Sequence, residues 1–522
     1  MTLQDPFSKN EQRLIYGLLI MGLIGFYYQL GIYPLFLEEP RRALIALEMV
    51  LQGDLLVPTQ TGNLYFRKPP FFSWLIIISD QLFGDHIELA VRSISVTSHI
   101  ILAYLSYLFF KRWSNREIAL LSALAFLFSV DIFYYFSALG EIDLFYALVT
   151  SSSIFVIFHY GEKSSYWRLF ILVYLLTAIC FLTKGLSALP YTVVSLLAYF
   201  VSRRKFKVLF SVQHCSGILM LVIILSLYFY AYSLVQDVNG WWSTLLSEST
   251  DKVTSGGFEK WLAHFASFPL DTLKNIAPAT LLIPALFVSQ QRQSIDKAML
   301  WIVLLNFAVY WFSVEGRSRY IYPLFPFMCY MIVFAVQKVD KAWVEKYLRV
   351  LSIILLLIMT LALPTIFFID SLMNIPNKLL TVVVGEVLVF LAWLHVFKYQ
   401  VRPFLLILAV LVIGKWGISS IMPQMRKINS DAAKDKGLAS EIAEVTAGKK
   451  IYRWGDVRFS LTTAYYLERE KQSILYKKDR IDSSAYYFVY EDDLIDFPPY
   501  LMILPLEYHS SKIYLVRPMQ SF

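Results

Sequence analysis

The sequence predicts an α-helical polytopic membrane protein that carries a small soluble α/β domain at its C-terminus. The 522 residues are 57% hydrophobic and only 16% charged, and their mean hydropathy is +0.55. A soluble domain usually carries roughly 25% charged residues. Many apolar runs reach the length of about 20 residues that a helix needs to cross a bilayer. The net charge is +8, and the basic residues lie in short loops between these runs. This placement indicates membrane orientation rather than nucleic-acid binding.

The apolar runs predict about 13 transmembrane helices. They lie near residues 14–33, 88–110, 117–136, 143–160, 168–183, 185–202, 215–236, 272–290, 298–313, 320–337, 348–369, 379–397 and 403–421. One further apolar stretch, 69–84, begins with two prolines and contains Asp80. At about 16 residues it is short for a span, so we expect a re-entrant or interfacial helix there.

Basic residues in the loops set the expected orientation. With the N-terminus inside, the inside loops contain Lys111, Arg112, Arg116, Lys163, Arg168, Arg203, Arg204, Lys205, Lys207, Arg292, Lys297, Lys338, Lys341, Lys346, Arg349, Lys398 and Arg402. The tight outside turn 137–142 has no Lys or Arg. Because basic loops remain on the cytoplasmic side, we expect the N-terminus inside and the C-terminal domain outside.

The composition also divides the chain into two parts. Residues 1–422 are expected to form a transmembrane domain with outer-face loops at 34–87 and 237–271. Residues 423–522 have a charged, soluble composition. Short strands are expected there at 451–454, 473–476, 486–490 and 512–516, and helices near 431–447 and 459–470. These elements predict an extracytoplasmic α/β domain of roughly 100 residues without a recognisable catalytic motif.

The first outer loop holds the most distinctive residues. Pro40 suits the first turn of a helix and Gly53 suits its end, with an apolar stripe at helical spacing between them. Glu38 and Glu39 precede this helix, where negative charge is favourable. Two interpretations stay open from these residues alone. The acidic pair caps the helix, or a carboxylate serves as general base beside a lipid-bound substrate.

An ordered series of motifs runs through this loop and beyond it. The loop contains Glu38-Glu39-Pro40-Arg41, Glu48-Met49, Gly53-Asp54 and Tyr65-Phe66-Arg67-Lys68-Pro69-Pro70. Farther along stand Phe181-Leu182-Thr183-Lys184-Gly185 and Arg317-Ser318-Arg319-Tyr320-Ile321-Tyr322-Pro323-Leu324-Phe325-Pro326. Their order and spacing resemble the polyprenyl-phosphate-sugar glycosyltransferases with the membrane-embedded GT-C fold, which include aminoarabinose transferases and protein O-mannosyltransferases. The resemblance covers roughly the first two thirds of the chain.

The resemblance implies a GT-C-like fold and a membrane glycosyltransferase of the cytoplasmic (inner) membrane. Such an enzyme transfers a monosaccharide from a polyprenyl-phosphate-linked donor to an acceptor at the outer face, with inversion. A lipid acceptor similar to lipid A and a protein acceptor both agree with the motifs. The implied partners are the donor, the acceptor and membrane lipids, with no nucleic acid.

This reaction needs a base for the acceptor and fixed positive charge for the departing phosphate. By the resemblance, Glu38 is the expected base, with Glu39 or Asp143 behind it. The residues expected to bind the donor phosphate are Arg41, Lys68, Arg317, Arg319, Tyr320 and Tyr322, and further substrate-site candidates are Glu141 and Lys184. Each basic candidate could instead extend to the membrane interface, and the tyrosines could belong to the interfacial aromatic belt.

Two departures from the family's pattern bear on the site. Glu38 stands where relatives usually have Asp, so the carboxylate reaches one methylene farther. Arg67 stands where relatives have an acid that helps to hold a divalent ion. No cofactor is therefore assigned, and a divalent metal is a disfavoured alternative whose ligands the sequence leaves unknown.

The main alternative is a transporter or flippase of a lipid-linked saccharide. It would also need many helices and basic contacts to phosphate. Transporters often contain internal repeats and helices broken near the midplane of the membrane. No repeat is found in this sequence, and the charged motifs gather at one predicted face, so the sequence favours glycosyl transfer.

Overall fold

The computed structural model describes residues 7–244, 247, 257–288, 295–336, 341–372, 375–508 and 511–519. Two basic residues expected in inside loops, Arg292 and Lys338, lie outside these ranges, as do parts of the expected outer loop 237–271. The chain divides into two compact units. The helical unit is Met1–Leu30, Arg92–Tyr230 and Asn239–Met425, and the loop–tail unit is Gly31–Val91, Ala231–Val238 and Arg426–Phe522.

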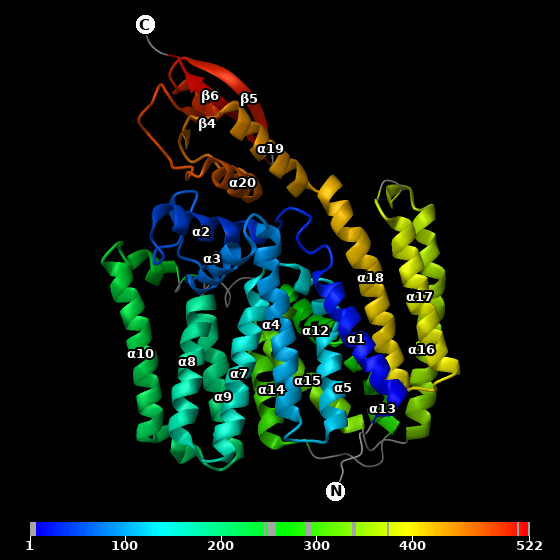
Figure 1. Cartoon of the computed structure of the whole chain (residues 1–522). Coiled ribbons are helices and arrows are strands. Elements are labelled where there is room, and N and C mark those ends of the chain that lie inside the picture. Colours follow the sequence, from blue (N-terminus) through cyan, green and yellow to red (C-terminus); the bar gives the residue numbers. More distant parts are fainter. Residues whose placement is uncertain are drawn as a thin grey trace. The chain divides into compact units, whose positions relative to one another are not determined.

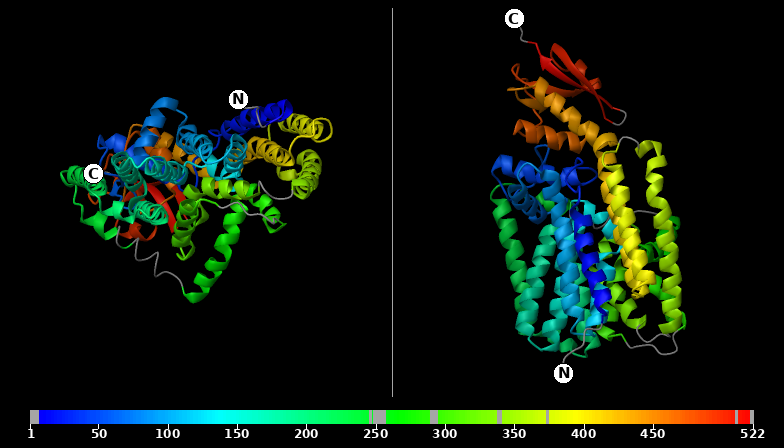
Figure 2. Two further views of the ribbon diagram at one scale, coloured as in Figure 1. Left: turned by 90° about the horizontal axis from the view of Figure 1, so that it is seen from below. Right: turned by 45° about the vertical axis from the view of Figure 1, so that its right-hand side comes forward.

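Most helices of the helical unit are long and broadly aligned, whereas α12 runs across them (Figures 1 and 2). They are α1 (Lys9–Tyr27), α4 (Ile87–Phe110), α5 (Arg116–Leu127), α6 (Val130–Tyr134), α7 (Ile142–Glu162), α8 (Tyr166–Lys184), α9 (Ala188–Ser202), α10 (Val212–Ser233), α12 (Phe258–Asn275), α13 (Ile283–Val288), α14 (Lys297–Trp311), α15 (Phe325–Val336), α16 (Lys341–Thr365), α17 (Lys378–Phe397) and α18 (Pro403–Asn429). Short 3₁₀ turns connect several of them, including η1 (Phe136–Ala138), η2 (Gly185–Ser187), η4 (Ala279–Leu282) and η5 (Ser318–Leu324). The predicted polytopic helical architecture is confirmed.

The expected number of about 13 spans is not confirmed. Within the described residues, eight helical stretches are long and apolar enough to cross a membrane, or nine if α5 and α6, bent by 46°, form one span. The expected span at 14–33 corresponds to α1, whose first turn is polar, and α14 has only 15 residues. The 37-residue stretch Tyr166–Ser202 counts once, although it folds back on itself.

The expected single helix at 272–290 is wrong. Helix α12 ends at Asn275, η4 follows Pro278, and α13 begins at Ile283, while residues 289–290 lie outside the described ranges. Proline has no backbone N–H and crowds the preceding turn, which favours a break at Pro278. The apolar composition of this segment therefore does not reveal the break between α12 and α13.

The reversal between α8 and α9 positions the end of α8. Gly185 follows α8 with φ = +73°, a conformation that side chains disfavour. The Thr177 and Thr192 hydroxyl oxygens then lie 2.7 Å apart across the two helices. At the far end, the Tyr199 hydroxyl donates to Glu162 at 3.0 Å. These contacts place Lys184, the last residue of α8, at the same end as the N-terminus of α7.

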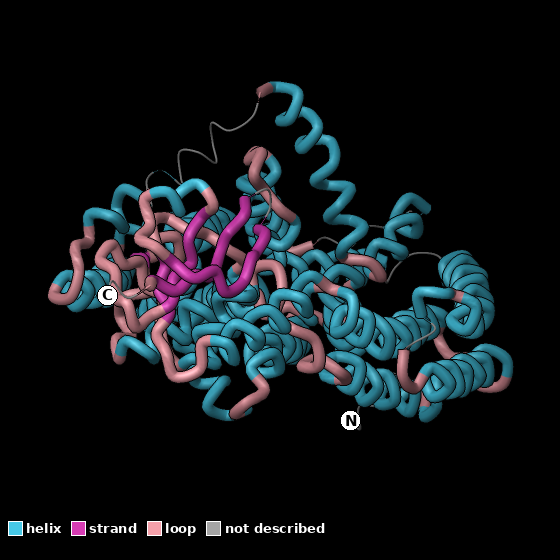
Figure 3. Tube along the Cα trace, turned by 90° about the horizontal axis from the view of Figure 1, so that it is seen from above, coloured by secondary structure: helices cyan, strands magenta, loops and turns pink. Residues whose placement is uncertain are grey.

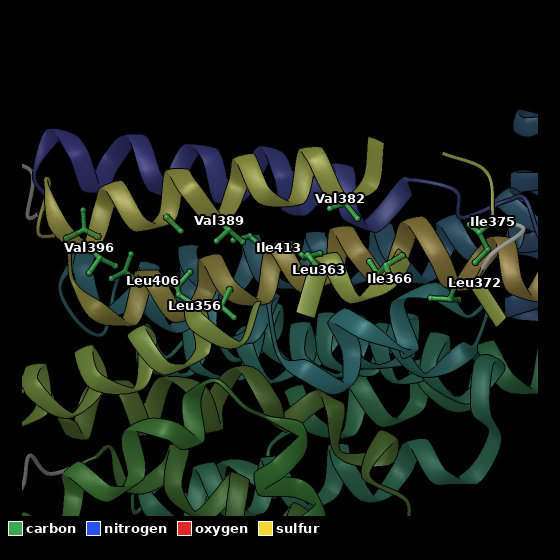
Figure 4. Close-up of a cluster of buried hydrophobic side chains, with 13 residues drawn as sticks. Leu356, Leu363, Ile366, Leu372, Ile375, Val382, Val389, Val396, Leu406 and Ile413 are labelled. Atoms are coloured by element: carbon green, nitrogen blue, oxygen red, sulfur yellow. The ribbon is translucent and has the colours of Figure 1, made fainter. Parts of the chain in front are cut away.

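Aliphatic side chains hold the three C-terminal helices of this unit together (Figure 4). Leu356 and Leu363 of α16 are buried with Val389 of α17 and Ile413 of α18. Since lipid tails are as apolar as these side chains, close packing stabilises such a contact more than withdrawal from water does.

The loop–tail unit combines the first loop with the C-terminal tail. Its elements are α2 (Glu39–Gln52), β1 (Thr59–Gln60), β2 (Asn63–Leu64), α3 (Phe71–Phe83), α19 (Asp431–Val445), β3 (Ile451–Arg453), α20 (Leu461–Lys471), β4 (Tyr486–Tyr490), β5 (Tyr500–Tyr508) and β6 (Ser511–Pro518). The expected short helix at 69–84 is present as α3, with 13 residues. Its location at a membrane surface stays a prediction.

The C-terminal strands form one mixed sheet in the order β3-β4-β6-β5 (Figure 3). Strand β3 pairs parallel with β4, and the other pairs are antiparallel. The expected strand 473–476 is wrong, because only an isolated bridge joins Arg453 to Lys477 there. Strand β5 was not predicted. It contains Pro505 and lies at the sheet edge, where a missing N–H is tolerated.

Candidate active site

The first group of candidate residues surrounds the N-terminus of α2. Pro40 occupies the first turn, and Gly53 ends the helix with φ = +70°. Glu38 is the N-cap residue, and Glu39 is the first residue of the helix. The expected helix and both of its ends are therefore confirmed.

The two adjacent glutamates have different surroundings. The Glu38 carboxylate pairs with the Arg41 guanidinium at 2.5 Å, and 37% of its side chain is exposed. Glu39 is fully buried, and its carboxylate accepts a hydrogen bond from the Phe36 backbone N–H at 3.1 Å. Glu38 can thus meet a substrate, whereas Glu39 fixes the loop that leads into α2.

Lys68 and Arg67 close the same loop before α3. The Lys68 side chain is half-buried, and that of Arg67 is exposed. Arg67 and Arg41 line one cavity, so two guanidinium groups meet there. Among the described residues, no three His, Cys, Asp or Glu side chains lie close enough together to hold a metal ion. These residues do not fit a divalent cation.

A buried carboxylate organises the β1–β2 turn. Glu48 of α2 accepts hydrogen bonds from the Thr59 hydroxyl at 2.6 Å, from the Gly62 N–H at 3.0 Å and from the Thr61 N–H. The guanidinium of Arg453 donates to the Thr61 carbonyl at 2.5 Å. The first loop is therefore joined to the start of the C-terminal sheet within the loop–tail unit.

Glu468 of α20 completes this buried cluster. Burial raises the pKa of Glu468 well above its ordinary value, and the neighbouring charge of Glu48 raises it further. Burial likewise raises the pKa of Glu48, opposed by the hydrogen bond from Thr59. The Glu468 Oε2 atom is buried and receives no hydrogen bond from the described donors. Two carboxyl groups so placed do not readily ionise together, so the folded pair favours retaining a proton.

The second group of candidates gathers in the helical unit around Asp143. Its carboxylate lies 2.6 Å from Lys184 Nζ and 3.6 Å from Arg319 Nε. Arg319 Nη1 also lies 3.9 Å from Glu141. The Lys184 and Asp143 side chains are only 9% and 4% exposed. The structure thus brings together four predicted residues from α7, α8 and η5 as two anions and two cations.

Aromatic rings enclose the lysine of this cluster. Lys184 Nζ lies 4.6 Å from the centre of the Tyr146 ring and 4.5 Å from that of Tyr320. Such cation–π contacts favour a charged ammonium in a fixed position. Tyr146 was not predicted, although it follows Asp143 by three residues and so lies on the same face of α7.

Tyr322 and Arg317 do not belong to the cluster around Asp143. The buried Tyr322 hydroxyl donates to Asp131 at 2.5 Å and thereby attaches η5 to α6. That hydroxyl is occupied by a protein acceptor. Arg317 precedes η5 and is exposed, and no ion pair with it is found within the described ranges.

Known proteins match this chain in sequence. The family model described as dolichyl-phosphate-mannose-protein mannosyltransferase matches residues 67–230. An undecaprenyl phosphate-alpha-4-amino-4-deoxy-L-arabinose arabinosyl transferase from Photorhabdus laumondii is 28% identical over 57% of this chain and 49% of its own length. A protein of the same name from Shewanella sediminis is 25% identical over 58% and 53%. The chain thus spans about half the length of these relatives.

The fold extends the similarity to nearly the whole chain. The crystal structures of ArnT from Cupriavidus metallidurans, apo and bound to undecaprenyl phosphate, each superpose with a TM-score of 0.71. They are 17% identical in sequence and cover 97% of this chain and 98% of that chain. The chain therefore shares the fold of these ArnT structures. The resemblance to glycosyltransferases that use polyprenyl-phosphate sugars, drawn from the loop motifs, is confirmed.

Proposed function

We propose that the protein transfers a monosaccharide from a polyprenyl-phosphate-linked donor to a lipid or protein acceptor, with inversion. The observation that carries the proposal is the partly exposed Glu38–Arg41 pair at the start of α2. It supplies a carboxylate that a substrate can reach, in a chain whose relatives are named for transfer from undecaprenyl phosphate.

In the proposed reaction, Glu38 accepts the proton of the acceptor hydroxyl as that oxygen attacks the anomeric carbon. The bond between the anomeric carbon and the phosphate oxygen breaks on the opposite side, and polyprenyl phosphate leaves with both bonding electrons. Arg41 orients the Glu38 carboxylate through their ion pair. Lys68, in the same unit as Glu38, is proposed to stabilise the departing phosphate. Lys184, Arg317 and Arg319 of the helical unit stay separate candidates for binding phosphate.

The Asp143 cluster refines two of these roles. Asp143 and Glu141 already balance the charges of Lys184 and Arg319, so Asp143 is better suited to orient these cations than to remove a proton. Arg319 Nε is buried and makes no hydrogen bond to the described residues. It faces the Asp143 carboxylate at 3.6 Å, so a phosphate oxygen would compete with that carboxylate for this N–H.

The proposal places the protein in the cytoplasmic membrane, with the N-terminus inside and the loop–tail unit outside. The support is the basic character of the loops assigned to the inside, such as Lys163 after α7 and Arg203 after α9. The division into a membrane part at 1–422 and an outer α/β part at 423–522 belongs to the same proposal.

Glu38→Gln tests the proposed base. The amide cannot accept the proton, so we expect kcat to fall about 10²–10⁴-fold while donor binding is retained. Purified protein would be assayed with lipid extracts that supply donor and acceptor, with the sugar gained by any product detected by mass spectrometry. Glu38→Asp keeps a carboxylate and should retain more activity than Glu38→Gln. Unimpaired transfer by Glu38→Gln would remove Glu38 from this role.

A further inference from the structure

A basic cavity of about 620 Å³ lies within the loop–tail unit. Its walls come from the first loop and from the C-terminal domain, and they include Arg41, Arg67, Arg453 and Arg458. The only carboxylate among its lining residues is Asp456. That side chain is itself paired with Lys477 at 3.1 Å. Since Arg41 is paired with Glu38, the positive charge of the lining comes chiefly from Arg67, Arg453 and Arg458.

The four arginines differ in how freely they can bind a ligand. Arg453 is buried, and its guanidinium donates to the carbonyls of Leu475 at 2.9 Å and Val457 at 3.2 Å, as well as to Thr61. It supplies fixed positive charge. Arg67 and Arg458 are exposed, and neither pairs with a carboxylate in the part of the chain that the structure describes. Their guanidinium groups can donate to a ligand.

The loop that carries Arg458 is held in place. The Arg458 backbone N–H donates to the Tyr490 hydroxyl of β4 at 2.9 Å. Glu48 fixes the opposite loop through the N–H groups of Thr61 and Gly62. The two walls are thus positioned by protein contacts before a ligand arrives, which lowers the ordering penalty of binding.

The remaining lining suits a polar group of saccharide size. It includes the amides of Gln60 and Asn63 and the aromatic rings of Tyr65 and Tyr508. Pockets of roughly 300–1,000 Å³ accommodate small-molecule ligands. Guanidinium groups bind phosphate oxygens through paired, charge-assisted hydrogen bonds.

We infer that this cavity is a binding site for a phosphate-bearing polar group, formed jointly by the first loop and the C-terminal domain. The phosphate would bind Arg67 and Arg458, with Arg453 as fixed charge behind it. This gives the C-terminal domain a ligand-binding role, which does not depend on the proposed transfer reaction. The same phosphate chemistry could come from a lipid headgroup or from a soluble sugar phosphate.

Binding by the full-length protein in phosphatidylcholine nanodiscs tests the site. The soluble probes are glucose 6-phosphate, inorganic phosphate and uncharged glucose, titrated calorimetrically. The lipid probe is phosphatidic acid included in the nanodisc, and the lipid that remains bound to the protein is measured by native mass spectrometry. We expect a phosphate-bearing probe to bind and glucose not to bind. The double variant R67A/R458A should weaken that binding about tenfold or more.

The matched control is Arg480→Ala, which removes an exposed arginine of the same unit that does not line the cavity. It should leave affinity within about twofold of wild type, because exposed charges act weakly at a distance. If R67A/R458A loses affinity only for glucose 6-phosphate, the phosphate comes from a soluble ligand. If it loses affinity only for phosphatidic acid, the phosphate comes from a lipid headgroup. Equal affinity of R67A/R458A and wild type for every phosphate probe, or no binding by wild type, would overturn the inference. Because no donor or transfer is involved, these outcomes are independent of the Glu38 experiment.

Discussion

At the scale of single residues, the candidate site depends on which charges are already neutralised by the protein. Asp143 is held between Lys184 and Arg319, whereas Glu38 has one cationic partner and an exposed edge. A buried carboxylate with two cations is costly to disturb, since removing one partner leaves charge uncompensated. The two carboxylates therefore differ in their surroundings: that of Asp143 is held by two cations, and that of Glu38 remains partly exposed.

Lys184→Met should destabilise the helical unit. The substitution keeps the apolar stem but removes the ammonium that lies 2.6 Å from Asp143. Because Arg319 remains nearby, we expect a loss at the low end of the range for broken buried pairs, about 3 kcal/mol. Unfolding of the purified protein in mixed detergent micelles would measure it.

Two variants control for the lysine experiment. Arg317→Met removes an exposed cation from the same region and should change the free energy of unfolding by no more than about 0.5 kcal/mol. The pair Lys184→Met with Asp143→Leu removes both charges and should recover most of the loss. Equal stability of Lys184→Met and wild type would show that the pair contributes nothing.

Local motifs allowed several single residues to be predicted. Glu38, Arg41, Lys184 and Arg319 were all singled out, and the last two do contact a predicted carboxylate, Asp143. The exposure that separates Glu38 from Glu39 could not be predicted, because adjacent residues of a helix N-terminus share the same sequence signals. That distinction depends on the tertiary contacts of the loop.

At the scale of elements, the central contact is that between α2 and α20 through Glu48 and Glu468. These residues are far apart in the chain, and the tail has no motif that marks Glu468 or Arg453 as partners of the first loop. A buried pair of like charges cannot be inferred from composition or periodicity. The missed strand β5 has a similar cause, since Pro505 obscures a strand that only an edge position permits.

The proton retained by this pair makes stability depend on pH. Burial raises the pKa of both carboxyl groups in the folded protein. As the pH rises above about 4.5, unfolded glutamates lose protons that the folded pair retains, so folding is progressively disfavoured. Glu468→Gln removes one of the two ionisable groups and should reduce this loss, although burial still raises the pKa of Glu48. Its melting temperature should therefore fall less between about pH 5 and about pH 8 than that of wild type.

Glu470→Gln is the matched control on the same helix. Its side chain is exposed, so it should melt with the pH dependence of wild type. Hydrogen exchange of the turn at 59–64 would localise the effect, because Glu48 fixes that turn. Parallel pH profiles for wild type and Glu468→Gln would refute the retained-proton account.

At the scale of the whole molecule, hydropathy was sufficient to predict a polytopic helical fold, and the loop motifs indicated the same kind of relatives that the sequence comparisons found. The superposition with ArnT from Cupriavidus metallidurans covers 97% of this chain. The number and the breaks of the helices could not be predicted as well. Apolar composition is the same on both sides of Pro278, and it does not reveal the reversal at Gly185.

The proposed orientation predicts which surfaces a reagent can reach from outside the cell. In a Cys215→Ser background, which leaves only the buried Cys180 and Cys329, a cysteine would be placed at Ser483 of the tail or at Lys163 after α7. A membrane-impermeant maleimide should label Ser483→Cys in intact spheroplasts and Lys163→Cys only after permeabilisation. The reverse pattern would invert the proposed topology.

The most direct test of the central claim is the identification of both products formed by the purified wild-type protein in liposomes. With a polyprenyl-phosphate sugar and extracted acceptors, the account predicts equal amounts of released polyprenyl phosphate and glycosylated acceptor, with the anomeric configuration inverted. Movement of intact lipid-linked sugar across the bilayer, with neither product formed, would contradict glycosyl transfer and indicate a flippase.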